Sequence, residues 1–138
     1  MNVDQCVLIN LPKITDPRGS LTFIEGNRHI PFAIKRVFYL YDVPSGETRG
    51  GHAHRTLHQL LICLAGSFDV LLDDGVAKSE IRLDRPWQAL HVPPMIWDTE
   101  VNFAPGSVCL VLASDDYLEP DYYRDYDQFL AAARAGIS

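Results

Sequence analysis

The sequence predicts an all-β protein whose chain ends in a short helix, and three features support this fold class. Short apolar or alternating segments recur along most of the chain. Turn signals rich in Gly, Pro, Asp and Ser separate these segments, and helical spacing of apolar residues occurs only near the C-terminus. Short strands at such spacing are typical of a β-sandwich or a β-barrel. The expected strands span residues 6–11, 20–25, 34–41, 57–64, 68–72, 79–83, 88–92 and 108–113.

Two local patterns are specific enough to predict individual elements. Apolar residues alternate along 60–64 and again along 68–72, and Gly66 between them allows a tight turn, which predicts a hairpin around residues 65–74. From Asp121 onward apolar side chains recur every three or four residues, which indicates an amphipathic helix packed against the barrel. The residues with this helical spacing are Tyr122, Tyr126, Phe129, Leu130 and Ala133.

The composition indicates a single folded domain over residues 1–138. Hydrophobic residues make up 47% of the chain and charged residues 22%, which suits a packed core. No apolar run approaches the ~20 residues that span a bilayer, and an acidic residue stands where a signal peptide would be basic. We therefore expect a cytoplasmic protein with no membrane partner. The net charge of −6 also argues against a nucleic-acid partner, because such partners need a basic surface.

The most informative segment runs from residue 49 to residue 59 and contains His52 and His54. Side chains two apart on a strand point to the same face, so both imidazoles can converge on one pocket. Histidine titrates near neutral pH and is also the commonest metal ligand. The pair therefore predicts a functional site rather than a structural one.

The segment from Gly46 to Gly66 resembles the first motif of the cupins, which spaces a glycine, a His-x-His pair, a glutamate and a second glycine in this way. Gln59 stands where metal-binding cupins carry the glutamate, and His58 is an alternative on strand parity. Residues 92–98 resemble the second motif but contain no histidine. A tight metal site needs three or four well-placed ligands. The resemblance thus implies a cupin jelly-roll barrel, and the residues favour one without a metal or other cofactor.

Three longer segments, residues 16–25, 38–75 and 113–130, together resemble the nucleotide-sugar 3,4-ketoisomerases. The resemblance covers almost the whole chain and is most specific in RGGHAHRTLHQ and DYDQFL. It implies an isomerase that converts dTDP-4-keto-6-deoxyglucose to a dTDP-3-keto-6-deoxyhexose in deoxyamino-sugar biosynthesis, as for a lipopolysaccharide or S-layer glycan. It also implies a homodimer, in which the apolar strand at 6–11 is a candidate for exchange between subunits.

Three other functions stay open from the sequence. The Arg-Gly-x-His piece is also similar to sugar 3,5-epimerases. A metal-dependent cupin oxygenase would hold iron with His52, His54 and either Gln59 or His58. A non-catalytic cupin would bind a nucleotide sugar without moving a proton. The sequence also leaves open the gluco or galacto configuration of the product at C4.

The histidine pair suits the chemistry of a ketoisomerase. In a 4-keto sugar the C3–H is acidic, because the carbanion formed there is delocalised onto the C4 oxygen. Isomerisation needs a base at C3, a group that stabilises the enediolate and a proton donor at C4. We expect His54 to act as the base and His52 to orient the ketone or complete the proton shuttle. Tyr39, on the strand before the motif, is a third candidate catalytic residue.

Five further residues are candidates for binding the substrate. The guanidinium groups of Arg18 and Arg49 match the oxygens of a pyrophosphate or a sugar hydroxyl. Gln59 is expected to bind a sugar or diphosphate oxygen rather than a metal. Tyr41 shares a strand face with the candidate catalytic tyrosine, and Trp97 is expected to stack on the substrate or wall the pocket.

Overall fold

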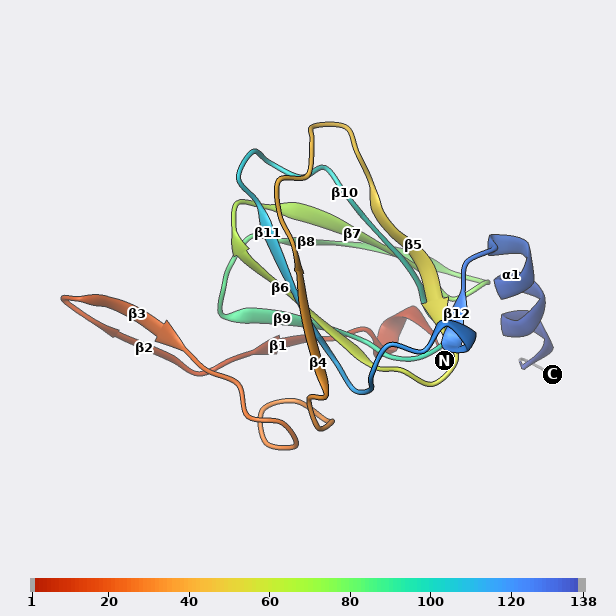
Figure 1. Cartoon of the computed structure of the whole chain (residues 1–138), viewed down its shortest axis with the longest axis horizontal. Helices are drawn as coiled ribbons and strands as arrows, with labels where there is room; N and C mark the ends of the chain where they lie inside the picture. Colours follow the sequence, from red (N-terminus) through yellow and green to blue (C-terminus); the bar gives the residue numbers. More distant parts are fainter. Residues whose placement is uncertain (1, 137–138) are drawn as a thin grey trace.

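A computed structural model describes residues 2–136 and contains two five-stranded antiparallel sheets and a separate hairpin. Figure 1 shows helix α1 (Tyr126–Ala135) at one end of the molecule and the hairpin of β2 (Lys13–Asp16) and β3 (Gly19–Thr22) at the other. The first sheet has the order β1 (Leu8–Asn10), β9 (Gln88–Val92), β6 (Gln59–Ala65), β11 (Val108–Ala113) and β4 (Arg36–Leu40). The second has the order β12 (Tyr122–Tyr123), β5 (Arg49–His54), β10 (Trp97–Val101), β7 (Phe68–Asp73) and β8 (Lys78–Leu83). Two short 3-10 helices are η1 (Val3–Gln5) and η2 (Glu119–Asp121).

The main hydrophobic core lies between the two sheets. The first sheet contributes Leu61, Cys63 and Val111 to it, and the second contributes Val70 and Leu72. These side chains are almost completely buried. Full burial of such a side chain contributes about 1.5–3 kcal/mol to folding, so this layer supplies much of the driving force.

A second apolar cluster covers the outer face of the first sheet. Leu60 and Ile62 of β6 point to this face, and Leu11, Ile30 and Phe32 from the N-terminal part of the chain pack over them. Strand β6 is therefore buried on both faces, which explains why its sequence is an unbroken apolar run.

The predicted fold class, an all-β cupin-like barrel with a short C-terminal helix, is confirmed. Each expected strand overlaps an observed one, and β9 and β11 have the predicted bounds. The expected strand ranges contain no counterpart of β2, β5, β10 or β12, although the histidine spacing already implies an extended segment at β5. Strand β10 escapes prediction because its inward residues, Asp98 and Glu100, are acidic, so its pattern is the reverse of an ordinary half-buried strand.

The predicted hairpin at residues 65–74 is wrong, because its two strands belong to different sheets. Strand β6 pairs with β9 and β11, whereas β7 pairs with β8 and β10. The chain crosses between the sheets at Gly66, whose φ of 76° lies in the left-handed region. A Cβ at this position would lie 2.3 Å from Oγ of Ser107. The alternating apolar side chains of β6 and β7 face each other across the core between the sheets, although the two strands are not hydrogen-bonded to each other.

The predicted C-terminal helix is confirmed, but it begins later than expected. Asp125 caps its N-terminus by accepting a hydrogen bond from the backbone N–H of Gln128. Before it, Tyr122 pairs with His54 as part of β12 and so lies outside the helix. No helix within residues 2–136 is long and apolar enough to cross a membrane.

Candidate active site

His52 and His54 lie side by side on the inward face of β5. Their ring centroids are 5.1 Å apart, and their side chains are 17% and 3% exposed. Ala53 between them is directed to the opposite face and is fully buried. The structure therefore brings the two histidines together, as the sequence predicts.

Two glycines immediately before the histidines shape this strand. His52 is opposite Asp98 on β10, while Gly50 is opposite Thr99, so Gly51 has no partner and forms a β-bulge. The φ angles of Gly50 and Gly51 are 77° and 75°, which favour glycine. A bulge re-aims the side chains that follow it, and here these are the histidines.

Asp121 holds the ring of His54. Its Oδ2 lies 3.2 Å from Nδ1 of His54, and its Oδ1 accepts hydrogen bonds from the backbone N–H and the hydroxyl of Thr56. Burial opposes ionisation of Asp121, but the hydrogen bonds from Thr56 and His54 keep its pKa below the ordinary value. Because a carboxylate only accepts, Nδ1 of His54 carries the hydrogen and Nε2 keeps its lone pair.

The electrostatic environment keeps His54 neutral. Burial lowers its pKa to about 4, and the neighbouring His52 acts in the same direction, while the charges of Asp98 and Asp121 oppose this shift. At neutral pH His54 is thus an uncharged imidazole with a free lone pair. This is the state that a general base requires.

Tyr122 completes one side of the cluster. Its ring centroid lies 4.3 Å from that of His54 and 5.3 Å from that of His52. Arg36 on β4 donates a hydrogen bond to the Tyr122 hydroxyl at 3.4 Å, and Arg124 lies over its ring at 4.2 Å. Nε of Arg36 is buried and has no partner among the described residues.

The sequence does not predict Asp121, Tyr122 and Arg36 as site residues. The helical spacing of apolar residues extends back to Tyr122, so the sequence predicts a helix from Asp121 onward and hides the first two. Pro120 and the capping aspartate at 125 are the signals that would have placed the helix start later.

Asp98 and Gln59 occupy the space beside the histidines inside the barrel. Asp98 is fully buried, and its Oδ1 accepts a hydrogen bond from Nε2 of Gln59 at 3.1 Å. The same oxygen lies 4.0 Å from Nε2 of His52. Gln59 therefore faces the site, whereas the sequence leaves this position open between Gln59 and His58, and the segment that resembles the second cupin motif supplies a carboxylate.

These residues do not fit the metal centre that the cupin fold suggests. Within residues 2–136, no group of three or more His, Cys, Asp or Glu side chains has an arrangement that could hold a metal ion. Gln59 turns its amide nitrogen, a donor, toward Asp98. His58, the alternative ligand, instead pairs with His91, with 3.0 Å between Nδ1 of His58 and Nε2 of His91.

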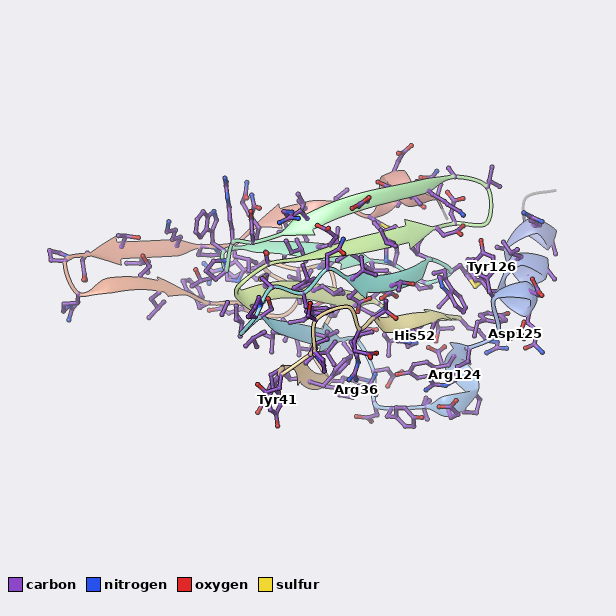
Figure 2. The ribbon with its side chains drawn as sticks, turned by 90° about the horizontal axis from the view of Figure 1, so that it is seen from above. Arg36, Tyr41, His52, Arg124, Asp125 and Tyr126 are labelled. Atoms are coloured by element: carbon purple, nitrogen blue, oxygen red, sulfur yellow. The ribbon has the colours of Figure 1, made fainter. Side chains whose placement is uncertain are left out.

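Four other predicted site residues do not reach the histidines within one chain. Tyr39 and Tyr41 are 59% and 62% exposed, because β4 directs Arg36 and Phe38 inward and the intervening residues outward. Figure 2 shows Tyr41 pointing away from the barrel, in contrast to His52. The other two of the four, Trp97 and Arg18, also lie away from the histidines. Arg49, a fifth candidate, lies exposed at the start of β5.

Strand parity and distance explain the positions of Trp97 and Arg18. Trp97 is on the outer face of β10, where it contacts Tyr126 and Phe129 of α1. Arg18 lies at the tip of the β2–β3 hairpin, where its side chain is 90% exposed and paired with Asp16. The expectation that Trp97 walls the histidine pocket is wrong.

Comparison with known proteins gives a consistent family. The model of the FdtA family, described as WxcM-like, C-terminal, matches residues 4–134. A TDP-4-oxo-6-deoxy-alpha-D-glucose-3,4-oxoisomerase of Aneurinibacillus thermoaerophilus is 52% identical over 122 residues, which cover 88% of each chain.

Solved structures agree with this result. The 3,4-ketoisomerase QdtA of Thermoanaerobacterium thermosaccharolyticum, a histidine-to-asparagine variant in complex with TDP-4-keto-6-deoxyglucose, is 42% identical over 95% of both chains, with a TM-score of 0.93. A 3,4-ketoisomerase of Helicobacter canadensis is 42% identical over 93% of this chain and 96% of its own, with a TM-score of 0.90. The chain therefore belongs to the FdtA family of nucleotide-sugar 3,4-ketoisomerases, as its resemblance in sequence predicts.

Proposed function

We propose that this protein is an isomerase that converts dTDP-4-keto-6-deoxyglucose to a dTDP-3-keto-6-deoxyhexose in deoxyamino-sugar biosynthesis. Its relatives carry the names of enzymes for this reaction. The observation that carries the proposal is the inward histidine pair in which Asp121 fixes the Nδ1 hydrogen of His54. A neutral imidazole with an oriented lone pair is suited to removing a proton from carbon next to a ketone.

The reaction moves one proton from C3 to C4 and another from O3 to O4, and it needs no net oxidant. His54 takes the proton from C3, and the electron pair of that bond forms the enediolate, with its charge on O4. The hydroxyl proton passes from O3 to O4, and a proton is placed on C4, which leaves the ketone at C3. We assign the transfer between the oxygens to His52, which lies next to His54 and is the more exposed of the two.

Two polar groups are placed to hold the sugar or its diphosphate. Gln59 faces the histidines from β6, and Arg36 brings a partly unsatisfied guanidinium to Tyr122 beside them. An arginine with a free donor matches a phosphate or carbonyl oxygen. Arg49, at the exposed start of β5, stays a candidate for the pyrophosphate.

Location in the cytoplasm also stays a prediction.

We further propose that the protein is a homodimer. The β2–β3 hairpin extends away from both sheets (Figure 1), and an isolated two-stranded hairpin is at best marginally stable in water. Ile14 and Leu21 are opposite each other in this hairpin, and each residue is 56% exposed. Val37 and Tyr39 add exposed apolar surface on β4. A second copy of the chain would cover these groups.

The decisive experiment is turnover of dTDP-4-keto-6-deoxyglucose in deuterated water, followed by NMR. We expect a 3-keto product with deuterium at C4, because the base exchanges its proton with solvent between the two transfers. His54→Asn should lose about 100- to 10,000-fold in rate while still binding dTDP, and His52→Asn should also be impaired. Binding of dTDP without any 3-keto product in the wild type would instead identify a binding module. Label at C3 or C5 without ketone migration would identify an epimerase.

A further inference from the structure

Two acidic side chains lie one after the other on the inward face of β10. Asp98 is 0% exposed and Glu100 is 4% exposed, while Thr99 between them is directed outward. Around them the barrel interior is mostly apolar. Burying one carboxylate in such surroundings is costly, and burying two adjacent ones is far more so.

The pair is chemically incomplete if both acids are ionised. Oδ2 of Asp98 and Oε2 of Glu100 are buried and have no partner in the described part of the chain. Burial raises the pKa of Glu100 well above its ordinary value, with the charge of Asp98 and a hydrogen bond to Asp98 acting in the same direction and Arg49 opposing them. Two buried, adjacent carboxylates without a countercharge inside the barrel repel each other, so the state in which the pair retains one proton is the less costly one.

The space for the Glu100 carboxyl group is provided by Gly50, the first of the two glycines before the histidines. A Cβ at Gly50 would lie 2.5 Å from Oε2 of Glu100 and 2.9 Å from the backbone oxygen of Asp98. Gly50 is thus required by a close approach of Glu100 as well as by its positive φ. The Glu100 side chain, which extends from β10, therefore packs directly against β5, the strand that carries the histidines.

Asp98 connects this acid to the histidines. Its Oδ1 accepts from Gln59 at 3.1 Å and lies 4.0 Å from Nε2 of His52. We propose that Glu100 is a positioning residue, which donates a hydrogen bond to Asp98 and thereby fixes a single negative charge beside His52. His52 takes up a proton while it transfers that proton from one sugar oxygen to the other. The negative charge of Asp98 stabilises this protonated state of His52. This step rests on the proposed isomerase function.

Several other groups face the acid pair and belong to its electrostatic environment. They are Arg49, His52 and His54 on β5, Cys109 on β11 and Cys6 before β1. Only Arg49 among these is permanently charged, and it is exposed to solvent.

The first test needs no turnover. The infrared spectrum of the wild type at neutral pH should contain the carbonyl band of a protonated carboxylic acid. Glu100→Gln should remove this band, and Thr99→Val, a change on the outward face of the same strand, should keep it. Absence of the band in the wild type, or its persistence in Glu100→Gln, would overturn the proposal.

The second test separates positioning from structure. Glu100→Leu removes the donor, and we expect kcat to fall about 10- to 100-fold with KM little changed, since the lost hydrogen bond is to a charged group. The acidic limb of its pH profile should move to higher pH. Glu100→Gln keeps a neutral donor and should recover most of kcat and the wild-type profile.

Each result of these measurements decides the matter. A folded Glu100→Leu variant with wild-type kcat and pH profile, or a folded Glu100→Gln variant as slow as the leucine one, counts against the proposal. If Glu100→Leu does not fold, the infrared band and the glutamine variant decide. If the wild type forms no 3-keto product at all, the isomerase function fails, and the infrared result still stands as a test of the shared proton.

Discussion

Nδ1 of His54 lies 3.2 Å from Oδ2 of Asp121, and this contact joins strand β5 to the end of η2, 67 residues later in the chain. Asp121 is itself fixed by Thr56, so the imidazole is held in one tautomer with Nε2 free. The arrangement matches the carboxylate–histidine pair of hydrolases, in which the acid orients the base without taking its proton.

Asp121→Asn should abolish most of the activity while the fold is kept. The amide oxygen can replace Oδ1 toward Thr56, which turns the amide nitrogen toward Nδ1 of His54. That nitrogen donates, so the hydrogen of His54 moves to Nε2 and the base is lost. We expect kcat to fall about 100- to 10,000-fold with intact binding of dTDP.

Thr56→Val is the matched control for this prediction. It removes the hydroxyl bond to Asp121 but keeps the backbone N–H bond, so its effect on kcat should stay below about tenfold. Nearly normal kcat in Asp121→Asn would show that Asp121 does not set the tautomer of His54.

The sequence places the histidine pair on one face because spacing of two residues on a strand fixes which side chains share a face. It leaves open the choice between Gln59 and His58, because Gln59 lies on the next strand, β6, and parity from β5 does not carry across the turn. The same rule does not tell which face is inward. In the FYLY segment of β4 both faces are apolar, so nothing local shows that Phe38 points in and Tyr39 out. The missing partners, Asp121 and Tyr122, come from pairing of β12 with β5, a long-range contact that local periodicity does not encode.

The stability of the protein should decrease as the pH falls from about 6.5 toward about 4. Burial lowers the pKa of both His54 and His91 to about 4, and it lowers the pKa of His58 as well. Between these folded values and the ordinary histidine value near 6.5, the unfolded chain binds more protons than the folded one. Urea unfolding at several pH values should therefore give falling free energies of unfolding across this range.

His91→Gln separates this effect from catalysis. The variant removes one titrating group of the His58–His91 pair, which lies outside the candidate active site. Its free energy of unfolding should vary less with pH, while kcat at neutral pH stays close to that of the wild type. An unchanged slope between pH 6.5 and 4 would mean that His91 is not buried in its neutral form.

Activity should survive removal of metal ions. The side chains that could complete a cupin metal site beside the histidine pair are engaged elsewhere: Gln59 donates to Asp98, and His58 pairs with His91. After dialysis against a strong chelator, we expect wild-type turnover and much less than one transition metal per chain by elemental analysis. Loss of turnover on chelation, with recovery on adding iron or zinc back, would favour a metal-dependent enzyme.

The hairpin of β2 and β3 provides a specific test of the homodimer. Ile14 and Leu21 form an exposed apolar pair on one face, while Thr15 and Ser20 form a hydroxyl pair, 2.8 Å apart, on the other. Light scattering of the wild type at micromolar concentration should give twice the mass of one chain. Ile14→Asp places a charge in the proposed interface and should shift the protein toward the monomer, since desolvating an unpaired carboxylate is costly.

Thr15→Asp adds the same charge on the opposite face and should leave the dimer intact. A wild-type protein that stays monomeric across this concentration range contradicts the homodimer, and equal masses for the two aspartate variants would place the interface away from the Ile14 face.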